Sequence, residues 1–274
     1  MNTMRSMMVG ATLAVACCAN AAVAQSASAH IALGDRAYAA QHPAAALAEY
    51  KLAIAAQPSN VSALWKASNA AVAVGEFPSV ANGSDTVAVR ATYYKQAEEY
   101  ARNAVSVDSA SAKAQFALAQ ALGRVALTID LPIGRVPYSR KVYRHATACL
   151  ALDPASASCA HVLGVWNAEV MRVPDDQRDM AIHILGAFEL SKASWENAKR
   201  YLERSMKAEP AVTLHHVDLA GVLRDMGDTV GARAQLAAAL ATPGTGVNEA
   251  HYKIQAQSML SALTTRRPTT SAMR

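Results

Sequence analysis

The sequence predicts an all-α fold, a right-handed solenoid of about five helical hairpins with one more helix capping its C-terminal end. Composition is the first reason, because 52% of the 274 residues are hydrophobic while only 5% are aromatic, and alanine supplies much of the apolar fraction. The second reason is that segments alternating apolar and polar residues over the length of a strand are scarce. The third is a spacing of small and large apolar residues that recurs along the chain.

The recurrent unit is clearest near the two ends of the chain. In the first copy the spaced residues are Leu33, Gly34, Ala46, Tyr50, Ala53 and Pro58. In the last copy they are Leu219, Ala220, Ala232, Leu236, Ala239 and Pro243, with the proline one place late. Small residues at these intervals mark where two helices touch, and a proline ends the second helix. The spacing resembles that of tetratricopeptide repeats, so each unit is expected to form one helical hairpin.

Three further units lie between these two, and insertions displace their second halves. Their first helices are expected over residues 63–75, 110–124 and 161–170, and their second helices over residues 93–109, 139–154 and 194–210. The connections are a polar loop over residues 76–85, a loop holding Pro132, Gly134 and Pro137, and a longer segment with a short apolar helix over residues 180–188. A last helix, from about residue 248 to residue 263, is expected to cap the stack.

Residues 1–24 are expected to be a secretory signal peptide, followed by the solenoid over residues 25–263. The segment has one basic residue, Arg5, no acid, an apolar run, and alanines placed for cleavage near Ala24. The run is too short to span a bilayer, so the mature chain is expected to lack a transmembrane span and to be secreted or periplasmic. The alternative is a lipoprotein anchored through Cys17, because the residues before it resemble a bacterial lipoprotein signal.

The formal charge of +5 belongs mostly to the ends of the chain. Arg5 lies in the signal peptide, and Arg266, Arg267 and Arg274 lie in residues 264–274, a basic tail without apolar periodicity that is expected to be disordered. Of the 26 basic residues, 22 then remain against 21 acidic ones. The solenoid itself is therefore nearly neutral.

Removal of the signal peptide would leave two cysteines, Cys149 and Cys159. They lie five residues on either side of Pro154, so an antiparallel helix pair that turns there would bring them level. In an oxidising compartment such a pair can form a disulfide. The alternative is two small buried thiols at a close helix contact.

The sequence offers no recognisable catalytic constellation. It lacks a glycine-rich phosphate loop, H-E-x-x-H, G-x-S-x-G and metal-spaced cysteines and histidines. His215 and His216 are adjacent, so on a helix they point about 100° apart, and we expect two partly exposed side chains. Acids near Asp175 are explained by a helix N-terminus. We therefore expect a protein that is not an enzyme and that has neither a metal nor a cofactor.

Several segments resemble a family more specific than the repeat itself. The motif LGVWNAEV, the spacer helix and SWENAKRYLERSMKAEP follow the segments ALWKAS, YYKQAEEYARNAV and LALDP in one order. This order is similar to that of the regulator of microtubule dynamics family of tetratricopeptide proteins, over most of residues 28–263. The resemblance implies a helical solenoid that binds other proteins. Microtubules are not carried over as the partner, because a signal peptide would send the chain away from tubulin.

The first helices of successive hairpins are expected to line one concave surface. By register, the residues that this surface presents are Trp65, Asn69, Lys113, Phe116, Gln120, Arg124, His161 and Glu169. Aromatic rings beside amide and basic groups suit an extended or helical peptide. The alternative for Trp65 and Phe116 is that they belong to the core between hairpins.

The sequence therefore predicts a non-enzymatic scaffold that binds a protein or peptide partner in this groove; the alternative is a membrane-associated assembly factor anchored by lipid at Cys17. Grip on a C-terminal carboxylate is disfavoured, because Ile31 and Asp35 occupy the positions that this mode requires in the first hairpin. The basic segment over residues 124–144 could dock an acidic partner or lipid headgroups, or be a solvated helix face. Nucleic acid is not expected as a partner, since no aromatic residues alternate with those arginines.

Overall fold

The computed structural model describes residues 25–79 and 85–265, which are helical apart from their turns and loops. A helix over residues 25–39 comes first. The elements after it are α2 (Pro43–Ala56), α3 (Val61–Glu76), α4 (Thr86–Val107), α5 (Ala112–Ala126), α6 (Pro132–Leu152), α7 (Ala157–Met171), α8 (Asp175–His183), the 3₁₀ helix η1 (Phe188–Lys192), α9 (Trp195–Ala208), α10 (Thr213–Asp225), α11 (Thr229–Ala241) and α12 (Glu249–Thr265). The signal peptide expected over residues 1–24 lies outside this description. So does the basic tail, except that α12 continues through Thr265.

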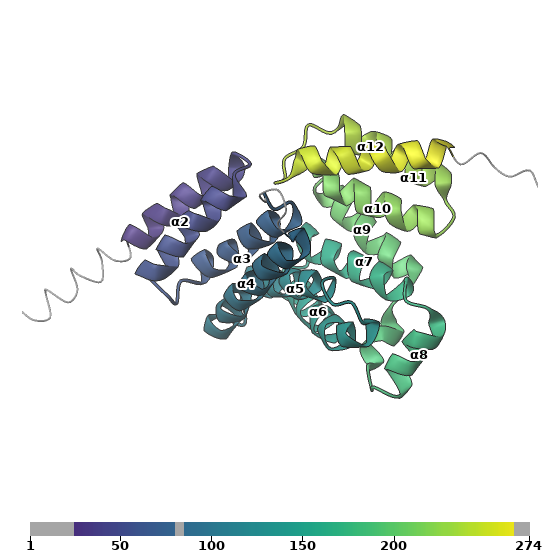
Figure 1. Ribbon diagram of the computed structural model, residues 1–274, viewed down its shortest axis with the longest axis horizontal. Coiled ribbons are helices and arrows are strands. Elements are labelled where there is room, and N and C mark those ends of the chain that lie inside the picture. The colour runs from purple at the N-terminus through teal and green to yellow at the C-terminus, as the bar shows by residue number, and fades with distance from the viewer. Residues whose placement is uncertain (1–24, 80–84, 266–274) are drawn as a thin grey trace, which may run out of the picture.

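The helices pair in chain order into the hairpins that the repeat predicts (Figure 1). The helix over residues 25–39 packs on α2, α3 on α4, α5 on α6, α7 on α9, and α10 on α11. Neighbouring hairpins touch through their first helices, since α3 contacts α5, α5 contacts α7, and α7 contacts α10. The all-α solenoid is confirmed. Within the described residues, no helix is both long enough and apolar enough to cross a bilayer.

Local sequence explains where the first helices begin and how closely they pack. Side chains of Asn60, Ser111 and Ser156 accept a backbone N–H of the first turn of α3, α5 and α7, as N-caps do. Eight residues after these caps, each helix carries a small buried residue: Ser68, Ala119 and Gly164. The helix axes can approach there because no bulky side chain intervenes.

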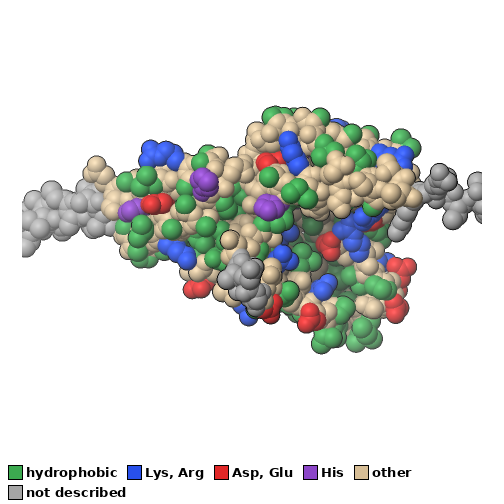
Figure 2. Space-filling view, turned by 45° about the horizontal axis from the view of Figure 1, so that its top comes forward, with side chains coloured by type: hydrophobic (Ala, Val, Ile, Leu, Met, Phe, Trp, Pro, Cys, Tyr) green, Lys and Arg blue, Asp and Glu red, His purple; other side chains and the backbone are tan. Residues whose placement is uncertain are grey.

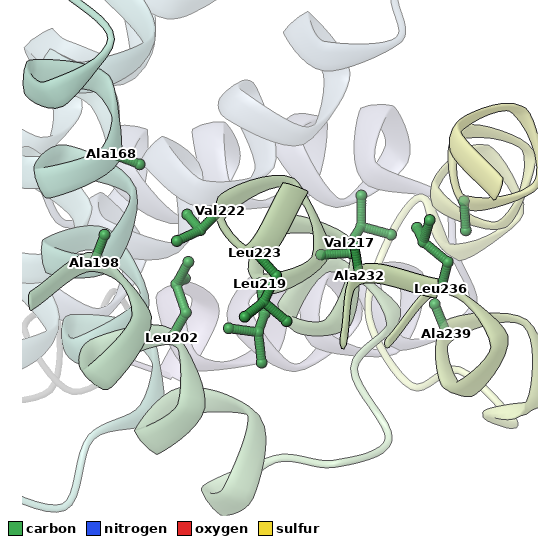
Figure 3. Close-up of a cluster of buried hydrophobic side chains, with 12 residues drawn as sticks. Ala168, Ala198, Leu202, Val217, Leu219, Val222, Leu223, Ala232, Leu236 and Ala239 are labelled. Carbon is green, nitrogen blue, oxygen red and sulfur yellow. The ribbon is translucent and has the colours of Figure 1, made fainter. Parts of the chain in front are cut away.

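Helices α7 and α9 approach each other closely. A Cβ atom placed on Gly164 would lie 2.6 Å from Cγ of Leu202 and 3.1 Å from its backbone nitrogen. Leu202 is fully buried and belongs to the core shared by α7, α9, α10 and α11 (Figure 3). That core contains alanine side chains, which let the helix backbones approach, and leucine side chains, which fill the space between the helices.

Several predicted boundaries are wrong, including the start of α7, which is Ala157 instead of residue 161. Helix α4 begins at Thr86, seven residues before the predicted start, because the Asp85 side chain caps it. Helix α6 begins at Pro132, where a missing N–H costs nothing, and it absorbs Pro137 in its second turn, so most of the expected loop is helical. The spacer helix covers Asp175–His183 instead of residues 180–188. Gly186 lies within the expected segment, and its φ of +64° is left-handed, so a right-handed helix does not continue through it.

Helix α12 caps the stack as expected, packing on α11 and α10, but it also reaches the second hairpin. The Asn248 side chain donates to the Ala73 carbonyl at 2.9 Å, and the Tyr252 hydroxyl donates to Glu76 Oε2 at 2.5 Å. The ring of His251 stacks on Phe77 with centroids 4.1 Å apart. The start of α12 therefore lies beside the end of α3, although about 175 residues separate them (Figure 1).

The turn between α6 and α7 brings Cys149 and Cys159 together. Both residues are buried, their Cα atoms are 5.9 Å apart, and a disulfide joins their sulfur atoms. The geometry is the one that an antiparallel pair turning at Pro154 implies. Oxidation of the pair in the native protein stays a prediction.

Thiol labelling tests that prediction. In the chain that begins at Gln25, labelling under denaturing, non-reducing conditions is expected to modify neither Cys149 nor Cys159. Reduction is expected to lower the free energy of unfolding by about 2–3 kcal/mol, because the crosslink closes a short loop in the unfolded chain. Quantitative labelling of both thiols before reduction would contradict the bridge and favour two buried thiols.

Candidate functional site

A cavity of about 1190 Å³ opens on the inner face of the stack. Its walls come from the ends of α3 and α5, from α7 and α10, and from α12, while α8 and the start of α6 form one side. Figure 2 shows the molecule hollowed beneath the last helices, with basic side chains at the edge of the hollow. The contact between α12 and α3 encloses this space from one side.

The structure places all eight predicted groove residues on the walls of two hollows. Trp65, Asn69, Lys113 and Phe116 line a small hollow of about 90 Å³, and Gln120, Arg124, His161 and Glu169 line the large cavity. Along α5, Lys113 and Phe116 of the N-terminal half face the small hollow, and Gln120 and Arg124 of the C-terminal half face the cavity. Trp65 is half-buried. It lines the small hollow and also packs against two core clusters, so it belongs both to the groove and to the core between hairpins.

Arg124 has a carboxylate partner inside the protein. Its guanidinium forms an ion pair with Glu76 Oε1, and Glu76 Oε2 accepts from Tyr252. Burial lowers the pKa of Arg124, but the surrounding acidic groups, Glu76 first among them, together outweigh burial, and the net pKa is raised. Burial and the same carboxylate raise the pKa of the Tyr252 hydroxyl. Arg124 is therefore a positively charged link between α5, α3 and α12, and its charge is already balanced.

His161 is also satisfied within the protein. Its Nε2 lies 2.8 Å from Oδ2 of Asp218 on α10, and its ring lies 4.9 Å from the ring of His215. Burial alone would raise the pKa of Asp218, but the hydrogen bond and charge of His161, together with the charge of Arg124, hold it below its usual value. The pair ties α7 to α10 at the floor of the cavity.

The expectation that His215 and His216 are partly exposed is wrong, because both are buried. Their side chains do diverge, as helical neighbours must. His216 bonds to Gln235 Oε1 and to the Pro210 carbonyl, whereas His215 lies against His161. The helix carrying them is enclosed between α9, α11 and α12, so both of its flanks are covered.

The buried His215 predicts acid sensitivity. Burial, helped by nearby His161, lowers the pKa of His215 to about 3. Between about pH 6.5 and pH 3 the unfolded chain therefore binds a proton that the folded chain refuses, so stability falls as the pH falls, by up to about 1.4 kcal/mol per unit. His215→Gln is expected to flatten this part of a denaturation-derived stability profile. An unchanged slope in the variant would show that His215 is not responsible.

The basic segment over residues 124–144 is partly paired within the protein, since Arg124 and Arg140 have carboxylate partners. Arg140 forms an ion pair with Glu189 at 2.9 Å, and Lys141 lies over the ring of Tyr138. Arg135 differs, because its Nε donates to the Ile129 carbonyl at 2.7 Å and no carboxylate faces it among the described residues. The segment is thus neither wholly a solvated face nor wholly a free basic patch.

Residues that the sequence did not single out complete the cavity. Arg172, the residue that follows α7, pairs with Glu169 and with Asp225, and Arg90 of α4 donates to the carbonyls of Gly75 and Glu76. No local pattern marks these residues, because the cavity joins hairpins that are distant in the chain.

Two polar atoms of the predicted groove have no hydrogen-bond partner within the described part of the chain. The side-chain oxygens Oδ1 of Asn69 and Oε1 of Gln120 are buried and accept no hydrogen bond in the described structure. Asn69 lines the small hollow and Gln120 lines the cavity. An unsatisfied buried oxygen costs free energy. A hydrogen bond from a donor of the partner would therefore be favourable at either oxygen, after a small movement of the Asn69 or Gln120 side chain.

The family described as "Regulator of microtubule dynamics protein 1-3" matches residues 30–264. Among solved structures, TTC0263, described as a thermophilic TPR protein of Thermus thermophilus, is similar with a TM-score of 0.61 and 16% identity, covering 86% of this chain and 99% of that one. MamA from Desulfovibrio magneticus RS-1 has a TM-score of 0.44 and 12% identity over 78% of this chain and 93% of its own.

YrrB, described as a TPR protein with an unusual peptide-binding site, has a TM-score of 0.40 and 13% identity over 84% of this chain and 90% of its own. No curated protein sequence matches this chain. At 16% identity, the similarity to TTC0263 establishes the tetratricopeptide fold and nothing finer.

Proposed function

The chain belongs to the regulator of microtubule dynamics protein 1-3 family, and we propose that it is a non-enzymatic scaffold that binds a protein or peptide partner on its inner face. One observation carries the proposal. The eight residues selected by register all line hollows of that face, and the larger hollow holds about 1190 Å³. Tetratricopeptide solenoids suit this role because successive first helices form a continuous concave surface.

The groove has the chemistry that a peptide needs. Trp65 and Phe116 offer apolar area in the small hollow, and the amide side chains of Asn69 and Gln120 can accept backbone N–H groups once they turn their buried oxygens toward the partner. Arg124 and His161 are held by internal carboxylates, so they shape the wall and contribute less to direct binding. This assignment favours a partner segment that lies across α3, α5 and α7.

Charge reversal at Lys113 tests the groove. Lys113 and Lys51 are both helical lysines, but only Lys113 lines a hollow of the inner face. Polypeptides captured by crosslinking in the native host are expected to bind Lys113→Glu about tenfold more weakly than the unmodified chain, roughly 1.4 kcal/mol. Lys51→Glu is the matched control and is expected to bind normally. Equal binding by both variants would place the partner elsewhere.

We further propose that the mature chain acts in an extracytoplasmic compartment. The support is the sequence of residues 1–24, which lie outside the described structure. Intact mass of the protein from its native host is expected to correspond to a chain beginning at Gln25. An acylated N-terminal Cys17 would instead support the lipid-anchored assembly factor, and an uncleaved chain would contradict both.

A further inference from the structure

We infer that the partner segment held in the large cavity is an amphipathic helix whose polar face carries Asp or Glu. The inference rests on the proposed function and deepens it by assigning the chemistry of the partner. The cavity joins two features that the groove residues alone do not show. These are a rim of exposed apolar side chains and a set of arginines in the wall.

The rim consists of large apolar side chains that the fold leaves exposed. Its members are Leu127, Leu131, Ile133, Met180 and Leu185, and all five line the cavity. Leu131 is 69% exposed and Ile133 is 52% exposed, although both stand at the start of a long helix. Burying such side chains stabilises a complex by about 25 cal/mol per Å² of apolar area. Apolar residues gathered at the mouth of one cavity indicate a contact surface.

The wall is rich in arginine. The described residues that line the cavity include six arginines and no lysine, against three carboxylates, those of Glu76, Glu169 and Asp218. The arginines are Arg90, Arg124, Arg135, Arg172, Arg178 and Arg224. Arginine presents a planar fork of donors that matches a carboxylate.

Two of these arginines have no carboxylate partner among the residues that the structure describes. Arg124 pairs with Glu76, Arg178 with Asp175, and both Arg172 and Arg224 with Asp225. Arg90 and Arg135 instead donate to backbone carbonyls, at 2.7–3.3 Å. Their positive charges are therefore available to a carboxylate brought by a partner, and a charged partner on this wall is favoured if it is acidic.

The size of the cavity suits a short helix. A helix is about 10 Å across and three of its turns are about 16 Å long, so an open cavity of about 1190 Å³ can receive one side of such a helix. Over three turns, residues at i, i+3, i+4 and i+7 form one apolar stripe. That stripe can lie on the rim while acidic residues on the next face meet Arg90 and Arg135.

Selection from a displayed library of random 12-residue peptides, with the chain beginning at Gln25 as the target, tests the inference. The expected peptides combine Asp or Glu with apolar residues at helical spacing, and they bind Arg135→Glu at least tenfold more weakly. Leu131→Asp is expected to weaken them as well, and Lys51→Glu is the control. Arg135 lies in the first turns of α6, where a glutamate suits the helix, so loss of binding would not reflect unfolding, which thermal denaturation checks.

Each of the other outcomes would overturn a specific part of the inference or of the proposed function. Basic or uncharged peptides that depend on Leu131 but not on Arg135 would overturn the acidic class while leaving the proposed function standing. Failure to select any peptide that depends on Leu131, together with normal partner binding by Lys113→Glu, would overturn both. Vesicles of phosphatidylglycerol that bind the unmodified chain, fail to bind Arg135→Glu and displace the selected peptides would assign the cavity to a lipid and overturn the peptide.

Discussion

Glu76→Ala is expected to lower the free energy of unfolding by about 3 kcal/mol, the largest effect of any single charge removal in the described chain. Glu76 is the acceptor for Arg124 and Tyr252, and it also lies 3.2 Å from the Asn248 side chain. Without it, the Arg124 guanidinium would remain largely enclosed without its ion-pair partner, and the nearby Asp218 carboxylate is already paired with His161. The variant would also remove the Tyr252 contact that helps to hold the start of α12 against α3. Urea denaturation monitored by circular dichroism measures the change.

Glu169→Ala is the matched control. Glu169 is also a helical glutamate paired with an arginine on the cavity wall, but its side chain is 43% exposed and Arg172 keeps Asp225 as a second partner. Exposed pairs contribute at most about 1 kcal/mol. Combining Glu76→Leu with Arg124→Met is expected to recover most of the stability lost by Glu76→Ala, because no unpaired charge remains. Equal losses for Glu76→Ala and Glu169→Ala would contradict the buried link.

Gly164→Val is expected to destabilise the protein by about 3 kcal/mol, through overpacking where α7 meets α9. The first added carbon already lies 2.6 Å from Leu202 Cγ and 3.1 Å from the Leu202 backbone nitrogen. Relief therefore requires the two helices to separate, which opens the core that Leu202 fills. Thermal unfolding of the variant is expected to show a lower Tm and reduced cooperativity.

Gly123→Val is the control for this site. Gly123 also lies in a first helix, but a Cβ atom placed on it would have Val142 Cγ2 as its nearest neighbour, at 3.9 Å. Valine favours helix over glycine by a few tenths of a kcal/mol, so stability should change by less than about 1 kcal/mol. If Gly164→Val were as mild as Gly123→Val, the close approach of α7 and α9 would not be essential to the fold.

Local signals explain why most of the fold could be predicted. Helices α3, α5 and α7 each repeat a side-chain cap and a small buried residue at the helix contact, as Ser156 and Gly164 do in α7. A predicted boundary was wrong where one residue type is compatible with two kinds of structure. Pro132 marks a loop by composition but a helix start by geometry, and the helix that it begins continues through Pro137.

The inner face could be predicted because register within a first helix decides which side chains share a face. The partners of those side chains could not, because they come from other hairpins. Arg124 meets Glu76 and His161 meets Asp218, 48 and 57 residues away in the chain. Closure of α12 on α3 likewise depends on how rotation accumulates along the stack, and no short segment encodes that rotation.

Site-specific photo-crosslinking in the native host tests the central claim, that the inner face binds a protein segment, most directly. A benzophenone amino acid replaces Leu131 at the cavity mouth or Val230 on α11, which is 79% exposed and does not line the cavity. The account predicts a polypeptide adduct from position 131 and none from position 230. Adducts from position 230 alone, or none from position 131 while a partner remains bound, would contradict it.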